Sequence, residues 1–402
     1  MTNTTQLRSS PSNDQSSETL PVGWRLAKLN DLYSAIRGVT FQSGEGKPYP
    51  FEDSIACITT SGVQDKIDWD SRRFIPIHRL SDKNQGLRAG DILVSTANSK
   101  ALVGKSCLVS EMPFPCTFGA FVTVFRPISY DIDTNFLAYW FRSPSTLAYF
   151  YEISANTTNI SNLRVTDILA IELPLPPLDE QYRIAARLNE QMTDVAQARQ
   201  AAEEQLGLLD DLIKAYLRDS LASQTTKKLL AECFVEVKKG VGKNWQNYPV
   251  IGATRAGVAP AKEKVGKQPE RYKLVEPGFI LYNPMRINIG SIAMLDEGDQ
   301  PGITSPDYVV FKSKEGIVHP RWFYYWFRSP YGEGFIKTFA RGAVRERMLF
   351  NRLANGEIEL PSWEVQCQVA EKLKEIKVLK QSLQAQLAEI NQLPSALLRQ
   401  AF

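Results

Sequence analysis

Three groups of residues could carry catalytic or metal-binding chemistry, and their spacing argues against each. Gly240-Val-Gly-Lys243 is too short for a phosphate-binding loop, because the upstream glycine and the Ser or Thr after the lysine are missing. His78 and His319 lie far apart without cysteine neighbours, so we expect neither a zinc site nor a hydrolase triad. The five cysteines form no CxxC pair, and we expect reduced structural thiols in a cytoplasmic protein.

Asn283-Pro284 resembles the start of the Asn-Pro-Pro-aromatic motif of amino-methyltransferases. In that motif the Asn side chain holds the target amine, and the aromatic ring stacks on the flipped base. Met285 and Arg286 occupy the third and fourth positions here, so the stacking ring is missing, and no glycine-rich cofactor loop accompanies the motif. We expect a non-catalytic chain without a cofactor of its own. A fused methyltransferase is an alternative that binding of S-adenosylmethionine by the purified chain would revive.

Polar and basic segments could bind nucleic acid without performing chemistry. Base edges are read by Arg, Lys, Asn, Gln, Ser or Thr side chains displayed on loops, and phosphate contacts hold the register. The candidates in the first half of the chain are Ser95, Thr96, Asn98, Lys100, Lys105, Asn156, Thr158, Asn159 and Arg164. The candidates in the second half are Arg255, Arg286, Asn288, Arg341, Arg345 and Arg347, with Lys262, Lys264 and Lys267 as a further basic stretch. Turn chemistry or a solvated basic face explains the same residue types.

The chain of 402 residues contains one internal repeat. Trp-Phe-Arg-Ser-Pro occurs at Trp140–Pro144 and at Trp326–Pro330, an offset of 186 residues. Ile-Glu-Leu-Pro occurs at Ile171–Pro174 and at Ile358–Pro361, an offset of 187 residues. Matches in one order at nearly one offset indicate two copies of one module.

Each module has the same predicted order of elements. Short apolar runs bounded by Gly, Pro, Asn and Ser predict strands, namely Asp91–Ser95, Phe121–Arg126, Phe279–Tyr282 and Tyr308–Phe311. Aromatic segments that follow them are helix-like, namely Phe136–Phe141 and Trp322–Phe327. A Pro-rich junction then leads into a long helix, which in the first module is expected from Asp179, as its N-cap, to Leu221.

Apolar residues at alternating spacings of four and three predict a coiled-coil seam on both long helices. The first seam is Leu188, Met192, Val195, Arg199, Ala202, Leu206, Leu209, Ile213 and Tyr216, and the second is Val369, Leu373, Ile376, Lys380, Leu383, Leu387 and Ile390. Because one helix leaves the first module and the other returns from the second, the two must pack antiparallel. Ordinary bundle helices are the alternative. The predicted fold class is α+β, with two α/β-type globular domains joined by two long antiparallel coiled-coil helices in a pseudo-twofold repeat.

The junctions carry a family resemblance. Leu173–Gln181 (LPLPPLDEQ), continued by Ile184–Leu188 (IAARL), resembles the entry to the central helix of the specificity subunits of type I restriction–modification systems. Leu360–Gln366 (LPSWEVQ) is a degenerate second copy that lacks the usual Pro-Pro and Glu-Gln. The ending Leu397–Phe402 and Trp24 are similar to the usual C-terminus and to the usual start of the first recognition domain.

The resemblance implies five segments. These are a disordered tail (1–19), target-recognition domain 1 (20–177), a central conserved helical region (178–225), target-recognition domain 2 (226–361) and a C-terminal conserved helical region (362–402). It also implies double-stranded DNA, two methylation subunits and restriction subunits as partners. S-adenosylmethionine, ATP and Mg would then be bound by those partners. Because the two modules differ outside their shared landmarks, we expect an asymmetric DNA target.

Two other interpretations stay open at this point. The net charge of only +3 requires any DNA-binding charge to be local, and a coiled-coil scaffold with protein-binding ends has the same architecture. DNA affinity that falls steeply with salt would distinguish the two. A DNA reader could also serve a different methylation–cleavage partner, or methylation subunits alone.

Overall fold

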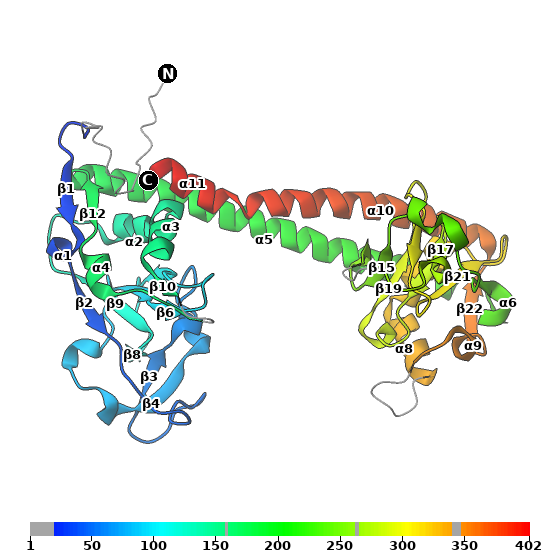
Figure 1. The fold of residues 1–402 in the computed structure, drawn as a ribbon, viewed down its shortest axis with the longest axis horizontal. Helices are drawn as coiled ribbons and strands as arrows, with labels where there is room; N and C mark the ends of the chain where they lie inside the picture. Colours follow the sequence, from blue (N-terminus) through cyan, green and yellow to red (C-terminus); the bar gives the residue numbers. More distant parts are fainter. Residues whose placement is uncertain (1–19, 157–159, 262–264, 340–346) are drawn as a thin grey trace. The chain divides into compact units, whose positions relative to one another are not determined.

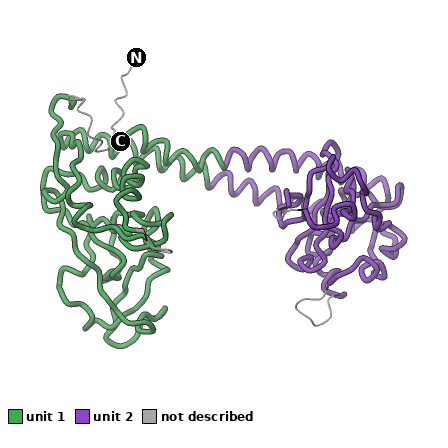
Figure 2. The backbone as a smooth tube through the Cα atoms, in the orientation of Figure 1, with its two compact units in different colours: residues 1–199, 388–402 green, residues 200–387 purple. Residues whose placement is uncertain are grey.

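The chain forms two compact units in the computed structural model, which describes residues 20–156, 160–261, 265–339 and 347–402. Unit 1 comprises residues 1–199 and 388–402, and unit 2 comprises residues 200–387 (Figure 2). Each unit therefore contains one globular module and a stretch of both long helices. The expected tail, residues 1–19, lies outside the described residues.

Unit 1 combines short strands with short helices (Figure 1). Its strands are β1 (Arg25–Lys28), β2 (Tyr33–Arg37), β3 (Ser54–Ile58), β4 (Arg73–Pro76), β5 (Ile92–Ser95), β6 (Ala97–Asn98), β7 (Ser106–Leu108), β8 (Cys116–Phe118), β9 (Val122–Pro127), β10 (Ala155–Asn156), β11 (Ser161–Asn162) and β12 (Glu172–Leu175). Its short helices are α1 (Leu29–Leu32), α2 (Thr134–Arg142), α3 (Pro144–Ile153), α4 (Val165–Leu169) and α11 (Leu393–Ala401).

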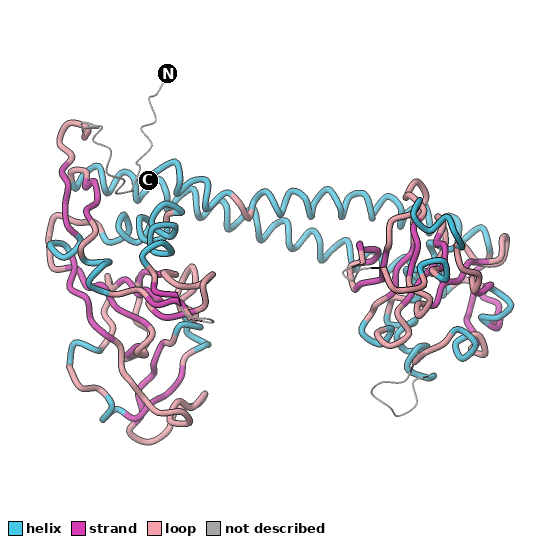
Figure 3. The backbone as a smooth tube through the Cα atoms, viewed as in Figure 1, coloured by secondary structure: helices cyan, strands magenta, loops and turns pink. Residues whose placement is uncertain are grey.

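Unit 2 follows the same plan (Figure 3). Its strands are β13 (Thr225–Leu229), β14 (Phe234–Glu236), β15 (Ile251–Thr254), β16 (Gly257–Pro260), β17 (Lys273–Val275), β18 (Ile280–Tyr282), β19 (Ile292–Met294), β20 (Gly302–Thr304), β21 (Val309–Ser313) and β22 (Glu357–Pro361). Its short helices are α6 (Leu230–Cys233), α7 (Pro320–Phe327), α8 (Pro330–Phe339) and α9 (Phe350–Leu353).

A four-stranded antiparallel sheet forms the frame of each unit. The strand order is β2-β9-β5-β7 in unit 1 and β14-β21-β18-β19 in unit 2. Alternate residues of the central strands enter different core clusters, with Phe125 packed in the cluster that contains α2 and Val124 packed in another. Phe311 and Val310 divide in the same way in unit 2. Successive side chains of a strand point to opposite faces of the sheet. Both faces of each frame sheet are therefore covered by a core cluster.

In chain order, β2 and β5 are the first two frame strands of unit 1, and β14 and β18 are those of unit 2. The segment between these two strands differs between the units. In unit 1, residues 38–91 contain β3 and β4, which form a sheet with β8. In unit 2, residues 237–279 contain the β15–β16 hairpin and β17, which pairs with β20. The repeat therefore consists of a constant frame that carries two unrelated inserts.

Two long helices follow the frames. Helix α5 spans Leu178–Ala222 and α10 spans Trp363–Ile390. The prediction that Asp179 is the N-cap of the first long helix was wrong, because the helix already begins at Leu178 and Asp179 lies in its first turn. A carboxylate there still favours the helix, since it faces the positive end of the helix dipole.

The predicted seam agrees with the burial of the helical residues. In α10, Val369, Leu373 and Ile376 are buried, whereas Val378 and Leu379 are exposed. Within unit 2, Asp210 of α5 pairs with Lys380 of α10. Further along α5, Leu217 shares a core cluster with Leu373, which comes earlier in α10. The helices therefore run antiparallel in this unit.

The structure corrects the alignment of the two junctions. The Leu29 amide donates to the Ile171 carbonyl at 2.9 Å, and the Leu230 amide donates to the Gly356 carbonyl at 2.9 Å. Ile171 is therefore equivalent to Gly356, an offset of 185 residues, and not to Ile358 at 187. The Ile-Glu-Leu-Pro match was misleading because a slip of two residues keeps the same strand face pointing inward.

A buried glutamine lies in the first turn of each long helix, including the one that follows the degenerate second junction. In unit 1, Gln181 Oε1 accepts from the Asp133 amide at 2.9 Å, and Nε2 donates to the Pro176 carbonyl at 2.9 Å. In unit 2, Gln366 Oε1 accepts from the His319 amide at 2.9 Å, and Nε2 donates to the carbonyl of Pro361. The second junction does lack Pro-Pro and Glu-Gln, but its glutamine keeps the same role.

The described helices include none that is both long enough and apolar enough to span a membrane.

Candidate nucleic-acid interface

Two polar segments predicted from the sequence of the first module lie side by side in unit 1. Strand β11 pairs with β6, so that Ser161 faces Asn98. Strand β10 pairs with the other side of β11, and the Leu163 amide donates to the Thr96 carbonyl at 2.8 Å. Backbone pairing therefore joins the β5–β7 loop to the segment around Asn156 and Arg164.

The side chains of Ser95 and Thr96 form hydrogen bonds on the buried side of this loop. Both residues are buried; Ser95 Oγ accepts from Asn98 Nδ2 at 3.0 Å, and the hydroxyls of Thr96 and Thr123 lie 3.1 Å apart. Because neither side chain reaches the surface, they can shape the loop but not contact a ligand in this conformation.

The basic candidates of unit 1 are more accessible. Lys100 is exposed and its Nζ lies 4.6 Å from the ring centroid of Tyr151, a cation–π distance. Lys105 is partly exposed and bonds the side-chain oxygen of Gln64. Arg164 is exposed just before α4. Asn156 lies in β10, whereas Thr158 and Asn159 lie outside the described residues.

The corresponding loop of unit 2 joins β18 to β19. Arg286 and Asn288 are both exposed on it. Asn283 Oδ1 accepts from the Met285 amide at 3.0 Å, which gives the Asn-Pro pair a local role in the turn. Gly290 closes the loop with a φ of 82°, a left-handed conformation that favours glycine.

The two loops are structurally equivalent although their sequences differ. Gly104 has a φ of 83° and precedes β7, just as Gly290 precedes β19. Counted back from these glycines, Lys100 and Arg286 occupy the same position. Each frame therefore presents a long cationic side chain on the same hairpin loop.

Further candidates gather around the unit 2 loop. Ser291 Oγ donates to the Ala253 carbonyl at 2.7 Å, which brings the β15–β16 hairpin and its exposed tip residue Arg255 alongside. The Met348 amide donates to the Pro284 carbonyl at 3.0 Å, and the neighbouring Arg347 pairs with Asp307 at 2.7 Å. Lys267 is exposed. Arg341, Arg345, Lys262 and Lys264 lie outside the described residues.

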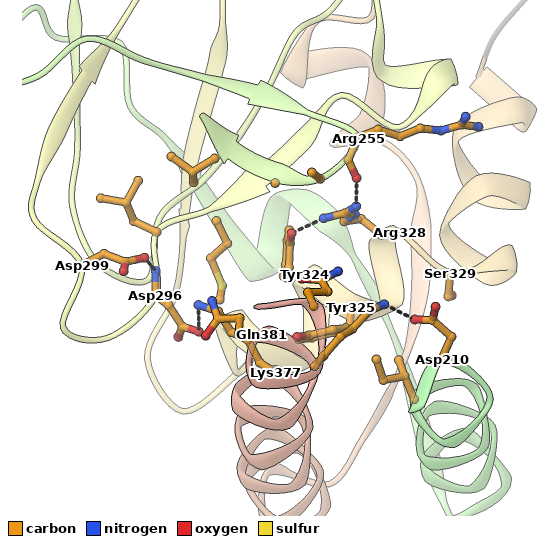
Figure 4. Close-up of a pocket in the computed structure, with 18 of the residues that line it drawn as sticks. Asp210, Arg255, Asp296, Asp299, Tyr324, Tyr325, Arg328, Ser329, Lys377 and Gln381 are labelled. Atoms are coloured by element: carbon orange, nitrogen blue, oxygen red, sulfur yellow. Dashed lines mark hydrogen bonds and ion pairs between the residues drawn. The ribbon is translucent and has the colours of Figure 1, made fainter. Parts of the chain in front are cut away.

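Arg328 was not among the predicted site residues. Its guanidinium bonds the Tyr324 hydroxyl and the Arg255 carbonyl (Figure 4). Its place in the repeated Trp-Phe-Arg-Ser-Pro string is the one sequence signal that could have indicated a role.

A cavity of about 760 Å³ separates the unit 2 frame from its stretch of long helices (Figure 4). Asp296 lies on its wall, 2.5 Å from Arg321 Nη2 and 2.8 Å from Lys377 Nζ. Burial alone would raise the pKa of Asp296, but hydrogen bonds from Arg321 and Lys377 outweigh it and lower that pKa. Asp296 and Asp210 thus each pair with a lysine on the wall of this cavity.

Comparison with known proteins finds a matching family model and similar specificity subunits. The family model for a type I restriction modification DNA specificity domain matches residues 21–202. The EcoKI specificity subunit of Escherichia coli K12 is 24% identical over 95% of this chain and 89% of its own length. The StySPI specificity subunit of Salmonella potsdam is 29% identical over 52% of this chain and 45% of its own length.

Solved structures share the fold. A chain from work on complex assembly and conformational transition of the type I R-M system has a TM-score of 0.63, with 18% identity over 95% of this chain and 98% of its own. The S subunit from M. genitalium has a TM-score of 0.52, with 14% identity over 99% of both chains. The match to the E. coli subunit extends along nearly the whole chain and agrees with the family model, so the chain is similar to type I restriction enzyme specificity subunits along nearly all of its length.

Proposed function

We propose that this chain is the DNA-specificity subunit of a type I restriction–modification complex. Its two target-recognition domains, residues 20–177 and 226–361, each read one half of an asymmetric, bipartite DNA site. The conserved helical regions, residues 178–225 and 362–402, dock two methylation subunits, and restriction subunits join them. The chain itself is non-catalytic and works in the cytoplasm. Its partners bind S-adenosylmethionine, ATP and Mg and methylate adenine N6.

One observation carries this proposal: equivalent hairpin loops on two equal frames present different side chains. Lys100 and Arg286 share a position, while Leu102 stands where the second loop has Asn288. Readers with one frame and different loops recognise different half-sites, whereas identical readers would recognise a palindrome. The different inserts, residues 38–91 and 237–279, favour an asymmetric target for the same reason.

The chemistry of the unit 2 loop suits base reading in the major groove. An arginine donates two hydrogen bonds to guanine O6 and N7, and an asparagine pairs with adenine N6 and N7. Arg286 and Asn288 are exposed on one short turn, while Arg255 and Arg347 flank it and suit phosphate contacts. Arg347 would then exchange its pairing with Asp307 for a phosphate oxygen.

Exposed apolar residues on the long helices support the docking of partner subunits. Leu208 and Leu212 of α5 are exposed, as are Val378 and Leu379 of α10. They lie outside the seam, so contact between the two helices does not cover them. Apolar side chains repeated along an exposed helix mark a protein interface.

Adenine methylation tests the proposal. The chain is expressed with its neighbouring methylation subunit in an unmethylated host, and modified adenines are mapped across the genome. Two short, different half-sites with a constant gap are expected. An assembled complex that modifies no site, and whose DNA affinity hardly changes with salt, would favour a protein-binding scaffold instead.

A further inference from the structure

Four of the five residues in the repeated Trp-Phe-Arg-Ser-Pro string are explained by the frame. Both tryptophans and both phenylalanines are buried in the cores of their units. Ser143 Oγ accepts from the Thr146 amide, and Ser329 Oγ accepts from the Tyr331 amide. The prolines that follow, at residues 144 and 330, begin α3 and α8, where a missing amide proton costs nothing. The arginine differs from these residues, because it belongs to neither apolar core and the Arg142 side chain is 25% exposed.

In unit 1 this arginine reaches the inserted segment. Arg142, the last residue of α2, donates from Nη2 to Asp65 Oδ1 at 3.2 Å. The neighbouring Gln64 accepts from Lys105 of the β5–β7 loop. Arg142 therefore connects the frame to an insert residue that directly precedes a contact of the candidate reading loop.

In unit 2 the equivalent arginine also reaches the insert, through different atoms. Arg328 directly follows α7 and bonds the Tyr324 hydroxyl and the Arg255 carbonyl at the tip of the β15–β16 hairpin. Gly257 of the same hairpin lies close to Tyr324 and Arg328. Its φ is 113°, and an added Cβ would lie 3.4 Å from the Tyr324 hydroxyl. The Arg255 side chain points away from Arg328 (Figure 4), so its guanidinium is left for another partner.

We propose that Arg142 and Arg328 are positioning residues that tether the variable insert of each recognition domain to the constant frame. Each arginine holds one insert in register with the reading loop beside it, and so sharpens the recognition of its own half-site. A guanidinium suits this role because several donors in a rigid fork can bond a carboxylate in one module and a backbone carbonyl in the other. This inference rests on the proposed DNA-reading function.

The test compares the full complex of wild-type chain and methylation subunits with complexes carrying R142A or R328A. Binding is measured to duplexes that carry the mapped target and to duplexes with single mismatches in either half. We expect R328A to reduce discrimination about tenfold against mismatches in one half-site only, and R142A to do the same for the other half. K337A, which removes an exposed cation near Arg328, serves as the control and should change neither.

Salt dependence separates a tether from a phosphate contact. A tether leaves the slope of log affinity against log salt unchanged in R328A, whereas a lost phosphate contact lowers the slope by about one unit and weakens all duplexes equally. R328K retains the charge but not the fork, so it should recover only part of the discrimination. A reduced slope, or equal loss in both half-sites, would overturn the proposal.

Unit 1 allows a test that does not depend on the arginine substitution alone. D65N removes the acceptor charge of an exposed residue, so it should reproduce R142A, and the double variant should be no worse than either single variant. Additive losses would contradict the tether. Wild-type complex that yields no bipartite target would contradict the proposed function, whereas a normal wild-type target with unaltered variants contradicts only the tether.

Discussion

Asp296 connects helices α7 and α10 of unit 2 through two ion pairs. Its carboxylate and Arg321 of α7 are both buried, and Lys377 of α10 donates from the other side. Removing one partner of a buried ion pair leaves the other charge without compensation, which is far more costly than losing an exposed pair.

We predict that Asp296→Ala lowers the unfolding free energy of unit 2 by about 3 kcal/mol at neutral pH. Glu297→Ala is the matched control, because Glu297 is exposed and its partner Lys374 is half-exposed; it should change that energy by less than about 1 kcal/mol. Urea denaturation measures both. Equal effects of the two substitutions would refute a special role for Asp296.

The same residue predicts a pH dependence. The pKa of Asp296 is lower in the folded chain than its ordinary value of 3.8, so the folded state binds fewer protons there than the unfolded state. The stabilisation is complete well above pH 3.8 and is lost as the pH falls through 3.8 toward the lower folded pKa. The difference in stability between wild type and Asp296→Ala should therefore shrink on acidification, as denaturation at a series of pH values would show. A difference that grows at acid pH would contradict this assignment.

Arg286 gives a prediction for recognition. Arg286→Ala should weaken binding to the mapped target at least about fivefold and relax the base requirement at one position only. Lys238→Ala, which removes another exposed cation of the same domain, should leave every position unchanged. Methylome mapping of the two variants measures the base requirement at each position of the target. Relaxation at several positions would contradict a single base contact and indicate a loss of structure.

Residue types could predict polar loops in both modules but not the orientation of their side chains. Ser95 and Thr96 belong to a polar run typical of a surface loop, yet both are buried. Ser95 ends the central strand β5, and the Thr96 carbonyl accepts from the Leu163 amide of the neighbouring segment. Arg328 shows the converse failure. Its bond to the Arg255 carbonyl joins residues far apart in the chain, and periodicity contains no information about such a contact.

At the scale of elements, the starts of α5 and α10 share one device. Gln366 accepts from the His319 amide and donates to the carbonyls of Ile317 and Pro361, and it is 1% exposed. A single side chain thereby holds the segment before α7, the end of β22 and the start of α10 together. Buried backbone groups that lose such partners are expensive.

Gln366→Ala should therefore lower the unfolding free energy of unit 2 by about 2–3 kcal/mol. The control is Gln368→Ala, because this exposed glutamine lies on the same turn of α10 and its loss should have almost no effect. Denaturant titration measures the difference. A Gln366→Ala variant as stable as wild type would mean that water replaces the amide without cost.

The central frame strands and both long helices were predictable, because strands buried on two faces leave continuous apolar runs and a seam leaves a periodic pattern. The predicted Asp91–Ser95 and Phe279–Tyr282 correspond to β5 and β18, and the expected Asp179–Leu221 helix corresponds to α5. The junction offset was not predictable, since strand periodicity tolerates a slip of two residues. The role of Gln366 was not predictable either, because its neighbours in the sequence differ from those of Gln181 although its hydrogen bonds are equivalent.

At the scale of the whole chain, each unit is completed by a segment that lies outside its frame sheet. In unit 2, Leu217 of α5 enters the core, and Ser220 Oγ accepts from Trp322 Nε1 at 3.1 Å. In unit 1, Leu398 and Phe402 of the final segment enter the core, and the rings of Phe402 and Phe136 lie 5.3 Å apart.

We predict that Phe402→Ala destabilises unit 1 by about 3 kcal/mol, since a buried ring is replaced by a cavity, and leaves unit 2 unchanged. Arg399→Ala, on the exposed side of the same helix, is the control. Hydrogen exchange should accelerate in α2 and not in α7. Equal acceleration in both would show that the units unfold together.

Exchange of one recognition domain tests the central claim of two independent readers on equal frames most directly. Residues 226–361 are replaced by the corresponding domain of a family member with a different, mapped target, and methylated adenines are mapped in an unmethylated host. One half-site should change to that of the donor, while the other half-site and the gap remain constant. A target in which both halves or the gap change would contradict the division of reading between the two modules.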